Sequence, residues 1–326
     1  MNPAVQAAVR EQLVDRRVRL ERAIEALPDA VDLSQLLQQV DRALSRLDGG
    51  EFGVCRLCHG EVEDELLLHN PLIEYCLCDL TPQQQTALEK DLDLAARLQL
   101  GLLPRQDLSH AGYTTHFRYE AAGPVSGDTC DLLPRGEETL LFLIGDVSGK
   151  GVAASLLMTH LHAAFRSLAA TGLGIEKLVE RSDRLLRENH IATHYATLVC
   201  GELTRQGKIR ICNAGHCPPV LIGRDRIRTF DATGFPVGMF GTEPYGVTED
   251  RIEPGDMLFL YTDGLSEARD GSSEEYGTQR LEEMLREVRS LPPSKAASAV
   301  LHDLHRFLQG GTHSDDLTML LIRRED

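Results

Sequence analysis

The chain has 326 residues, 42% of them hydrophobic, which is enough for about two domains with packed cores. Its net charge of −16 argues against a general nucleic-acid binder, because proteins bind DNA mainly by neutralising phosphates with lysine and arginine. The chain has no run of about 18 apolar residues, and its N-terminus lacks the apolar core of a signal peptide, so we expect a cytoplasmic protein without a membrane span.

Two helices are predicted at the N-terminus, over residues 1–26 and 33–47. In the second, apolar residues recur every three or four positions, Asp32 or Ser34 could cap its start, and Gly49-Gly50 ends it. The sequence LPDAVD between the helices is typical of the tip of a hairpin. We expect the two amphipathic helices to pack on each other or on a second copy of the chain.

Four of the eight cysteines lie in one short segment. Cys55 and Cys58 form a CxxC pair, and Cys76 and Cys78 follow after 17 intervening residues. In a reducing compartment, clustered cysteines are typical of metal sites rather than of disulfides, and four thiolates suit a closed structural zinc site. The second pair is followed by an aspartate, so the fourth ligand is either Cys78 or Asp79.

Residues 36–80, which include VDRALSRLDGGEFG ahead of the cysteines, resemble the DksA/TraR-type C4 zinc finger. The resemblance implies one structural Zn²⁺, although the family usually carries CxxC at the second pair. It also implies an alternative function, a transcription-associated protein that binds RNA polymerase and presents the acidic PDAVD tip. Helices of about 15–25 residues reach only about 22–38 Å, which is short for deep insertion into a partner.

A further helix is predicted over residues 82–103, with Thr81 as its cap and Pro82 at its first position. One face of this helix resembles the seam of a coiled coil. The seam residues are Leu88, Leu92, Ala95, Gln99 and Leu102. We therefore predict a regulatory module over residues 1–81, a linker helix over 82–104 and a second domain over 105–326, with a homodimer formed through the N-terminal and linker helices.

The stretch LLFLIGDVSGKG, residues 140–151, has the composition of a phosphate-binding loop. A Walker-type loop needs four residues between its first glycine and the following Gly-Lys pair. Only three residues separate Gly145 from Gly149, so the spacing is wrong. Asp146, which stands at the end of a buried-type strand, is the better candidate for chemistry.

Similar acidic residues stand at the ends of other predicted strands, in MLFLYTDG, HSDDLTMLLI and SGDTCD. They are Asp263, Asp315, Asp316, Asp128 and Asp131. In an antiparallel sheet the exit of one strand lies beside the entry of its neighbour, so these carboxylates can converge at one edge. Converging carboxylates repel one another unless cations lie between them, and all-oxygen sites select Mg²⁺ or Mn²⁺. Two such ions could hold a hydroxide for attack on a phosphoryl group.

Five motifs in this order, SGDTCDLL, IGDVSGKG, NAGHCPP, YTDGLSEA and SDDLTML, resemble those of the PPM (protein phosphatase 2C-like) phosphatases, in particular the bacterial SpoIIE/RsbU branch. The likeness covers about residues 88–326 and implies an α+β fold, an antiparallel β-sandwich flanked by helices with a two-metal centre at one edge. It implies hydrolysis of phosphoserine or phosphothreonine without a covalent phosphoenzyme. In this branch the substrates are commonly phosphorylated anti-sigma antagonist (STAS) proteins, and a sensory module controls the phosphatase.

The resemblance also implies a role for each acidic residue around two Mn²⁺ or Mg²⁺ ions. Asp146 would bridge both ions, and the Val147 carbonyl would help to bind one of them. Asp263 and Asp315 would bind the other ion and complete the catalytic set. Asp128 would bind directly or through water, and Asp316 would lie behind the ligands.

Three further positions have roles that the sequence leaves open. Gly149 and Gly151 would let the chain turn from strand into helix beside Asp146. Lys150 is either solvated or a phosphate contact. His216 in NAGHCPP is either a structural residue of a turn or a general acid. The arginine that binds phosphate in the eukaryotic relatives has no clear counterpart.

Overall fold

The structure of the protein is a computed structural model. It describes residues 3–26, 31–56, 60–74, 76, 82–188, 194–224, 226–239, 244–309 and 315–325. The chain divides into two compact units, Met1–Asp91 and Leu92–Asp326, and the division falls inside helix α4 (Pro82–Leu100). Within the described ranges, no helix has both the length and the apolar character needed to cross a bilayer.

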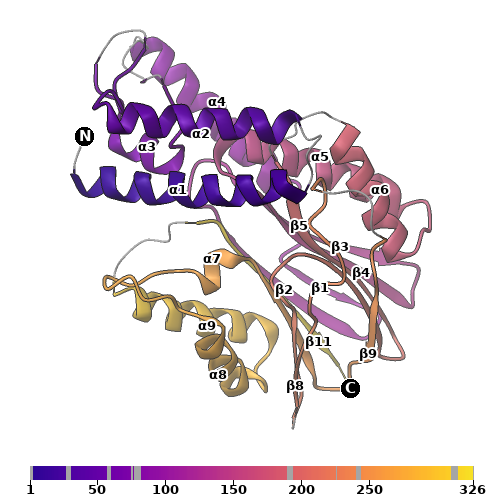
Figure 1. The fold of residues 1–326 in the computed structure, drawn as a ribbon. Coiled ribbons are helices and arrows are strands. Elements are labelled where there is room, and N and C mark those ends of the chain that lie inside the picture. Colours follow the sequence, from indigo (N-terminus) through magenta and orange to yellow (C-terminus); the bar gives the residue numbers. More distant parts are fainter. Residues whose placement is uncertain are drawn as a thin grey trace. The chain divides into compact units, whose positions relative to one another are not determined.

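The first unit is helical, with α1 (Pro3–Ala26), α2 (Val31–Asp48) and the short α3 (Asp64–His69) (Figure 1). Its buried core includes Val9 and Leu13 of α1 and Val40 and Leu44 of α2, so the two helices pack on each other as predicted. The helix α2 ends at Asp48, as the two following glycines indicate. It begins at Val31, earlier than predicted, so Asp32 and Ser34 lie inside the helix rather than before it.

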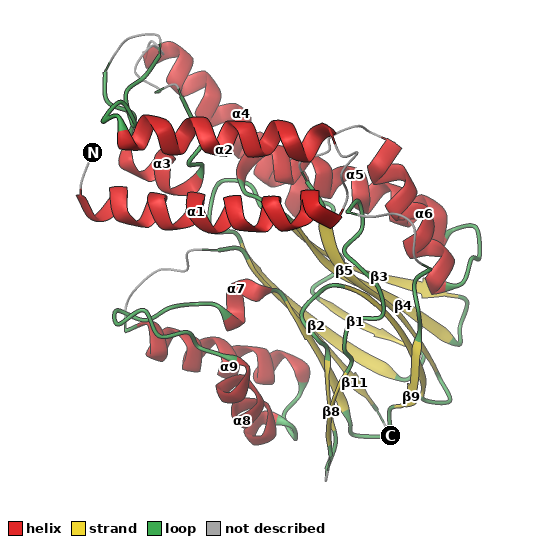
Figure 2. Ribbon diagram, viewed as in Figure 1, coloured by secondary structure: helices red, strands yellow, loops and turns green. Residues whose placement is uncertain are grey.

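The second unit contains two antiparallel sheets (Figure 2). The six-stranded sheet has the order β1-β2-β11-β10-β7-β8, and the five-stranded sheet has the order β3-β4-β5-β6-β9. The strands are β1 (Asp107–His110), β2 (Tyr113–Glu120), β3 (Asp128–Arg135), β4 (Thr139–Val147), β5 (Ala196–Thr204), β6 (Lys208–Ala214), β7 (Val220–Ile222), β8 (Ile227–Thr229), β9 (Thr248–Arg251), β10 (Met257–Tyr261) and β11 (Leu317–Arg324).

Helices cover the outer faces of both sheets. The helices are α5 (Gly151–Ala169), α6 (Ile175–Glu188), α7 (Asp263–Ser266), α8 (Thr278–Val288) and α9 (Pro293–Leu308). Side chains of β4, β5 and β6 pack with α5 and α6, and side chains of β10 and β11 pack with α8 and α9. A third cluster of buried residues joins the two sheets. The predicted α+β fold, an antiparallel β-sandwich flanked by helices, is confirmed.

Strand β4 shows why the sequence folds into these layers. Successive side chains of a strand point to opposite faces. Phe142 and Ile144 therefore face the other sheet, whereas Leu141 and Leu143 face α5 and α6. Because both faces are covered, the strand is a continuous apolar run rather than an alternating one.

Helix α4 begins at Pro82, as predicted, but its apolar face is used differently from the predicted seam. Gln99, a seam residue, is buried and hydrogen-bonded to Ser126 within the second unit. Leu94 and Leu98 on another side of the helix are 50% and 65% exposed. Of the five seam residues, Gln99 is buried whereas Leu88 is 41% exposed, and at Gln99 the face packs within its own unit and is not available to a coiled coil.

Candidate metal centre

Asp128 and Asp146 lie directly opposite each other at one end of the five-stranded sheet. Asp128 is the first residue of β3, and Asp146 is the penultimate residue of β4, and the two are cross-strand partners in the antiparallel register. Strand alternation turns both toward the six-stranded sheet, because Cys130 and Ile144, two residues away on each strand, belong to the cluster between the sheets. The sandwich therefore places two carboxylates together at its edge.

Thr318 of β11 and Thr262, which directly follows β10, hold Asp128. Thr262 Oγ1 donates to Asp128 Oδ2 at 2.8 Å, and Thr318 Oγ1 donates to the same oxygen at 2.6 Å. Asp128 is 1% exposed, so these hydrogen bonds connect the two sheets inside the protein. Burial raises the pKa of Asp128 well above its usual value and Asp316 raises it further, whereas both threonine hydroxyls act in the opposite direction.

Asp263 and Asp315 stand at the matching end of the six-stranded sheet. Asp263 begins α7 directly after β10, and Asp315 precedes β11, which pairs with β10 in antiparallel register. The backbones approach so closely here that a Cβ on Gly264 would lie 2.0 Å from the Asp316 carbonyl oxygen. Only glycine fits at this position, which brings the chain after β10 against the chain before β11.

Asp316 fastens the loop that precedes Asp128. Its Oδ1 accepts from the Ala122 amide at 2.8 Å, and its Oδ2 accepts from the Gly127 amide at 2.9 Å. A Cβ on Gly127 would lie 3.2 Å from Asp146 Oδ1 and 2.9 Å from the Val147 carbonyl oxygen. Both carboxylate oxygens of Asp316 are thus used to hold backbone, which agrees with the expected place behind the ligands.

We define the acidic cluster as Asp128, Asp146, Asp263, Asp315 and Asp316. Its carboxylates repel one another when they are ionised. The pKa of Asp146 is raised to about 9, first by burial and then by the other four carboxylates. The pKa of Asp263 is raised to about 6 by burial, with a further contribution from Asp315, and Lys150 acts in the opposite direction. Such a site favours either protonation or the binding of cations.

The donor set fits hard divalent cations, although the side chains are not closed around one. In the described part of the chain, no three His, Cys, Asp or Glu side chains already form a group that could hold a metal ion. All donors of the acidic cluster are oxygens, which Mg²⁺ and Mn²⁺ prefer. A cation is in fact present at its edge, since Lys150 Nζ lies 3.0 Å from Asp315 Oδ2.

The turn from β4 into α5 places Lys150 there. Gly149 and Gly151 have φ angles of +92° and +76°, in the region that glycine adopts readily and other residues rarely do. They allow the chain to reverse between Val147 and the start of α5, as expected. Lys150 is therefore paired with a residue of the acidic cluster and is not simply solvated.

Two candidates from the same motifs lie outside the acidic cluster. Asp131 is fully buried and accepts from Arg166 Nε at 2.6 Å and from Arg166 Nη2 at 2.9 Å, because three residues along β3 reverse the face from that of Asp128. His216 is buried, its Nδ1 lies 2.8 Å from Thr197 Oγ1, and burial lowers its pKa to about 4. Its backbone amide donates to Asn213 Oδ1 at 2.8 Å, which favours the role of a structural turn residue.

The predicted zinc site is described only in part. Cys58, Cys78 and Asp79 lie outside the described residues. Cys55 is buried, and its amide donates to the Gly60 carbonyl at 2.8 Å. Cys76 is disulfide-bonded, so it could bind zinc only after reduction. The zinc site stays a prediction.

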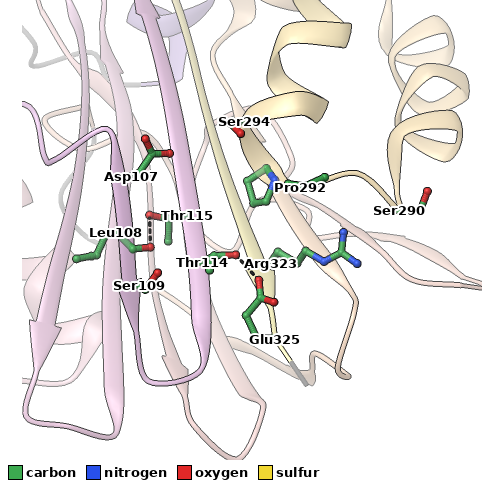
Figure 3. Close-up of a pocket in the computed structure, with 11 residues that line it drawn as sticks. Asp107, Leu108, Ser109, Thr114, Thr115, Ser290, Pro292, Ser294, Arg323 and Glu325 are labelled. Carbon is green, nitrogen blue, oxygen red and sulfur yellow. Dashed lines mark hydrogen bonds between the residues drawn. The ribbon is translucent and has the colours of Figure 1, made fainter.

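A separate cavity of about 440 Å³ lies at the opposite end of β11 from the acidic cluster (Figure 3). Its lining includes Thr114, Arg323 and Glu325. The Arg323 guanidinium donates to the Leu291 carbonyl at 2.8 Å, and Glu325 accepts from Thr114, so these polar groups already have partners. We assign the cavity no role in the chemistry of the acidic cluster.

Sequence reasoning did not identify Thr262, Thr318 and Gln99 as residues of this region. The two threonines stand beside acidic motif residues, in YTDG and DDLT, which is the only signal that could have drawn attention to them. Gln99 was placed on a coiled-coil seam. What each of them contacts depends on how the two sheets and α4 pack, which no local pattern encodes.

Comparison with known proteins shows which family this fold and its acidic cluster belong to. Residues 136–325, more than half of the chain, match the SpoIIE family (Stage II sporulation protein E). IcfG of Synechocystis is 28% identical over 263 residues, which cover 72% of this chain and 41% of that protein. Phosphoserine phosphatase RsbU of Bacillus subtilis is 25% identical over 252 residues, which cover 74% of this chain and 72% of that protein. The chain thus spans less than half the length of IcfG.

The fold has a solved counterpart. The PP2C domain of SiaA from Pseudomonas aeruginosa matches with a TM-score of 0.65 at 20% identity, over 73% of this chain and 97% of that one. The likeness to the SiaA domain shows the fold, and the match to the SpoIIE family model shows the family. The chain belongs to the SpoIIE family, and its second unit has the fold of a PP2C-type phosphatase domain.

Proposed function

We propose that the second unit hydrolyses phosphoserine or phosphothreonine in a protein substrate, with two Mn²⁺ or Mg²⁺ ions held by the acidic cluster. The observation that carries the proposal is the convergence of these carboxylates at one end of both sheets. Burial and then the repulsion of the other four carboxylates raise the pKa of Asp146 to about 9, and bound divalent cations would relieve the repulsion.

Each residue of the acidic cluster has a proposed task. Asp146 would help to hold both ions with support from the Val147 carbonyl, Asp263 and Asp315 would hold the second ion, and Asp128 would bind directly or through water. The two threonines keep Asp128 in one orientation. When bound, such ions neutralise charge on the phosphoryl oxygens and lower the pKa of an attacking water.

Direct attack by water is favoured over a covalent intermediate. The Cys217 thiol lies near the acidic cluster, but burial and the neighbouring carboxylates raise its pKa to about 12. A thiol that stays protonated at neutral pH is a poor nucleophile. Burial lowers the pKa of His216 to about 4, so its imidazole is neutral at pH 7 and is a poor general acid for the leaving group. The acidic cluster is therefore the proposed source of the catalysis.

The proposed substrate is a phosphorylated STAS-type protein in a bacterial regulatory pathway. This proposal rests on the resemblance to the SpoIIE/RsbU branch and on the relative RsbU, which is named a phosphoserine phosphatase. Dephosphorylation of a phosphorylated STAS protein should be faster than that of an unrelated phosphoprotein such as casein. Equal rates on both would leave the phosphatase activity intact but remove this substrate class.

The first unit is proposed to regulate the phosphatase, as a module with one structural Zn²⁺ and as part of a homodimer. The hydrogen bond from the Cys55 amide to the Gly60 carbonyl and the ion pairs of Glu74 with Arg46 and Arg56, at 3.1 Å and 2.9 Å, support the proposed finger. Metal analysis of the reduced protein would test the zinc proposal directly.

The activity is tested with purified protein that has been stripped of metal with EDTA and then supplied with Mn²⁺ or Mg²⁺. We expect hydrolysis of an aryl phosphate and of a phosphoserine protein only when metal is added. Asp146→Asn should lower the rate by about 10²–10³-fold, the order found when one key electrostatic group is removed. Asp231→Asn, at an exposed position, is the matched control and should leave the rate unchanged. Retained activity in Asp146→Asn would defeat the proposal.

A further inference from the structure

Gln99 is a polar residue buried on the inner face of α4. Its side chain is 6% exposed, Nε2 donates to the Ser126 carbonyl at 2.9 Å, and Oε1 accepts from the Ser126 amide at 3.1 Å. One side-chain amide thus satisfies both backbone groups of a single residue, which is itself fully buried. An apolar residue here would leave both groups unpaired inside the protein.

Ser126 stands at the junction between α4 and the acidic cluster. Ser126 Oγ accepts from the Asp128 amide at 3.0 Å. The next residue, Gly127, donates its amide to Asp316 at 2.9 Å and accepts from the Val147 amide at 3.2 Å. Every backbone polar group from Ser126 to the Asp128 amide therefore has a partner, and each partner is Gln99 or a residue in or beside the acidic cluster.

This chain of contacts makes the position of Asp128 depend on α4. A displacement of Ser126 would move the start of β3 and would break the bond between Gly127 and Asp316. Gly127 also lies against Asp146, since a Cβ there would be 3.2 Å from Asp146 Oδ1.

We propose that Gln99 is a positioning residue for the divalent-cation site. From α4 it fixes the Ser126–Gly127 backbone and thereby the spacing of Asp128, Asp146 and Asp316. It touches neither the cations nor the phosphoprotein. The proposal rests on the proposed function of the acidic cluster, and it adds a residue outside the acidic motifs on which metal affinity depends.

The test measures Mn²⁺ binding directly, by calorimetry and by electron paramagnetic resonance, on the metal-free full-length protein without substrate. Gln99→Met removes both hydrogen bonds at similar volume. We expect Mn²⁺ affinity to fall by about 10- to 100-fold, the range found when a partner of a metal ligand is lost. Arg97→Ala, at an exposed position two residues away on α4, is the control and should change the affinity by less than about twofold.

A second variant, Gln99→Glu, keeps the test decisive if Gln99→Met does not fold. Gln99→Glu keeps the size and the acceptor for the Ser126 amide but replaces the donor to the Ser126 carbonyl with an oxygen. We expect it to fold, as judged by circular dichroism, and to bind Mn²⁺ more weakly than the wild type. If Gln99→Met does not fold, this variant decides the question. Folded variants with wild-type Mn²⁺ affinity overturn the positioning role, even if their melting temperatures fall.

The outcome also distinguishes a failure of the positioning role of Gln99 from a failure of the proposed function of the acidic cluster. If the wild-type protein itself binds no Mn²⁺ or Mg²⁺, the proposed function of the acidic cluster fails and the role of Gln99 fails with it. If the wild type binds and hydrolyses but the Gln99 variants match it, only the positioning role is lost. A purely structural role would lower stability without shifting the Mn²⁺ concentration needed for half-maximal binding.

Discussion

Asp146 is kept where its negative charge is unfavourable. Burial and its acidic neighbours raise its pKa to about 9 in the absence of metal, far above the value of about 3.9 for an aspartate in an unfolded chain. The folded protein therefore binds this proton more tightly than the unfolded chain does. The associated stability is fully present below pH ~4 and is lost progressively as the pH rises toward about 9.

Replacing Asp146 with asparagine should make the metal-free protein more stable at pH 8, because folded Asp146 must take up a proton that the unfolded chain has released at this pH, and asparagine avoids that free-energy cost. The melting temperature should rise by about 2–4 °C for each kcal/mol gained, as expected for a domain of this size. At pH 4 the two proteins should melt together. Thermal melts of EDTA-treated protein check this, and a variant that is less stable than the wild type at pH 8 would contradict it.

Lys150 carries a positive charge whose effect on substrate binding can be tested. Its ammonium lies 3.0 Å from Asp315, and the side chain is about one third exposed. We expect Lys150→Met to raise KM for a phosphoprotein by up to about fivefold, the range of an exposed ion pair, with a smaller change in kcat. The physical reason is that the Lys150 ammonium would attract the phosphate without replacing the proposed cations. Lys177→Met, which breaks the surface pair with Glu180, is the matched control and should leave KM unchanged.

At the level of elements, helix α5 must be held against β3 for its first turn to stay beside Asp146. Arg166 on α5 forms two hydrogen bonds to Asp131 on β3, which is fully buried. Removing one partner leaves an uncompensated buried charge, a loss of about 3–5 kcal/mol that is reduced here because Arg166 is half exposed.

Arg166→Met should therefore lower the melting temperature by several degrees and lower the rate as well. Arg286→Met, whose partner Glu282 lies on the surface of α8, should cost less than about 1 kcal/mol. Chemical and thermal unfolding of the two variants, measured side by side, checks the difference. Equal losses would mean that the pair between Arg166 and Asp131 does not anchor the helix.

The elements themselves could be predicted because local patterns determine them. Pro82 marked the start of α4, and apolar runs ending in aspartate marked the edges of β4 and β10. The partner of a buried face could not be predicted in the same way. Gln99 has the spacing of a seam residue, and only the packed structure shows that it binds Ser126. Threonines that support Asp128 were missed for the same reason, because their contacts join strands that are distant in sequence.

For the whole molecule, the two units have separate cores. The buried cluster of the first unit contains only residues from 9 to 67, and the three clusters of the second unit contain none of them. Each unit therefore buries its own apolar surface, and we expect each to fold without the other. Dependence of the phosphatase on the first unit would then reflect regulation and not a loss of folding.

Removal of residues 1–81 tests that regulation. We expect the truncated protein to fold and to keep Mn²⁺-dependent hydrolysis of an aryl phosphate, but to change its rate on a phosphoprotein or its Mn²⁺ affinity, because the predicted regulatory module and its dimer contacts are gone. Rates, metal affinity and molecular mass by light scattering are compared with the full-length protein. An unchanged rate together with full dimerisation would remove the regulatory role. The isolated residues 1–81 would then be tested for capture of RNA polymerase, which the alternative hypothesis requires and the regulatory one does not.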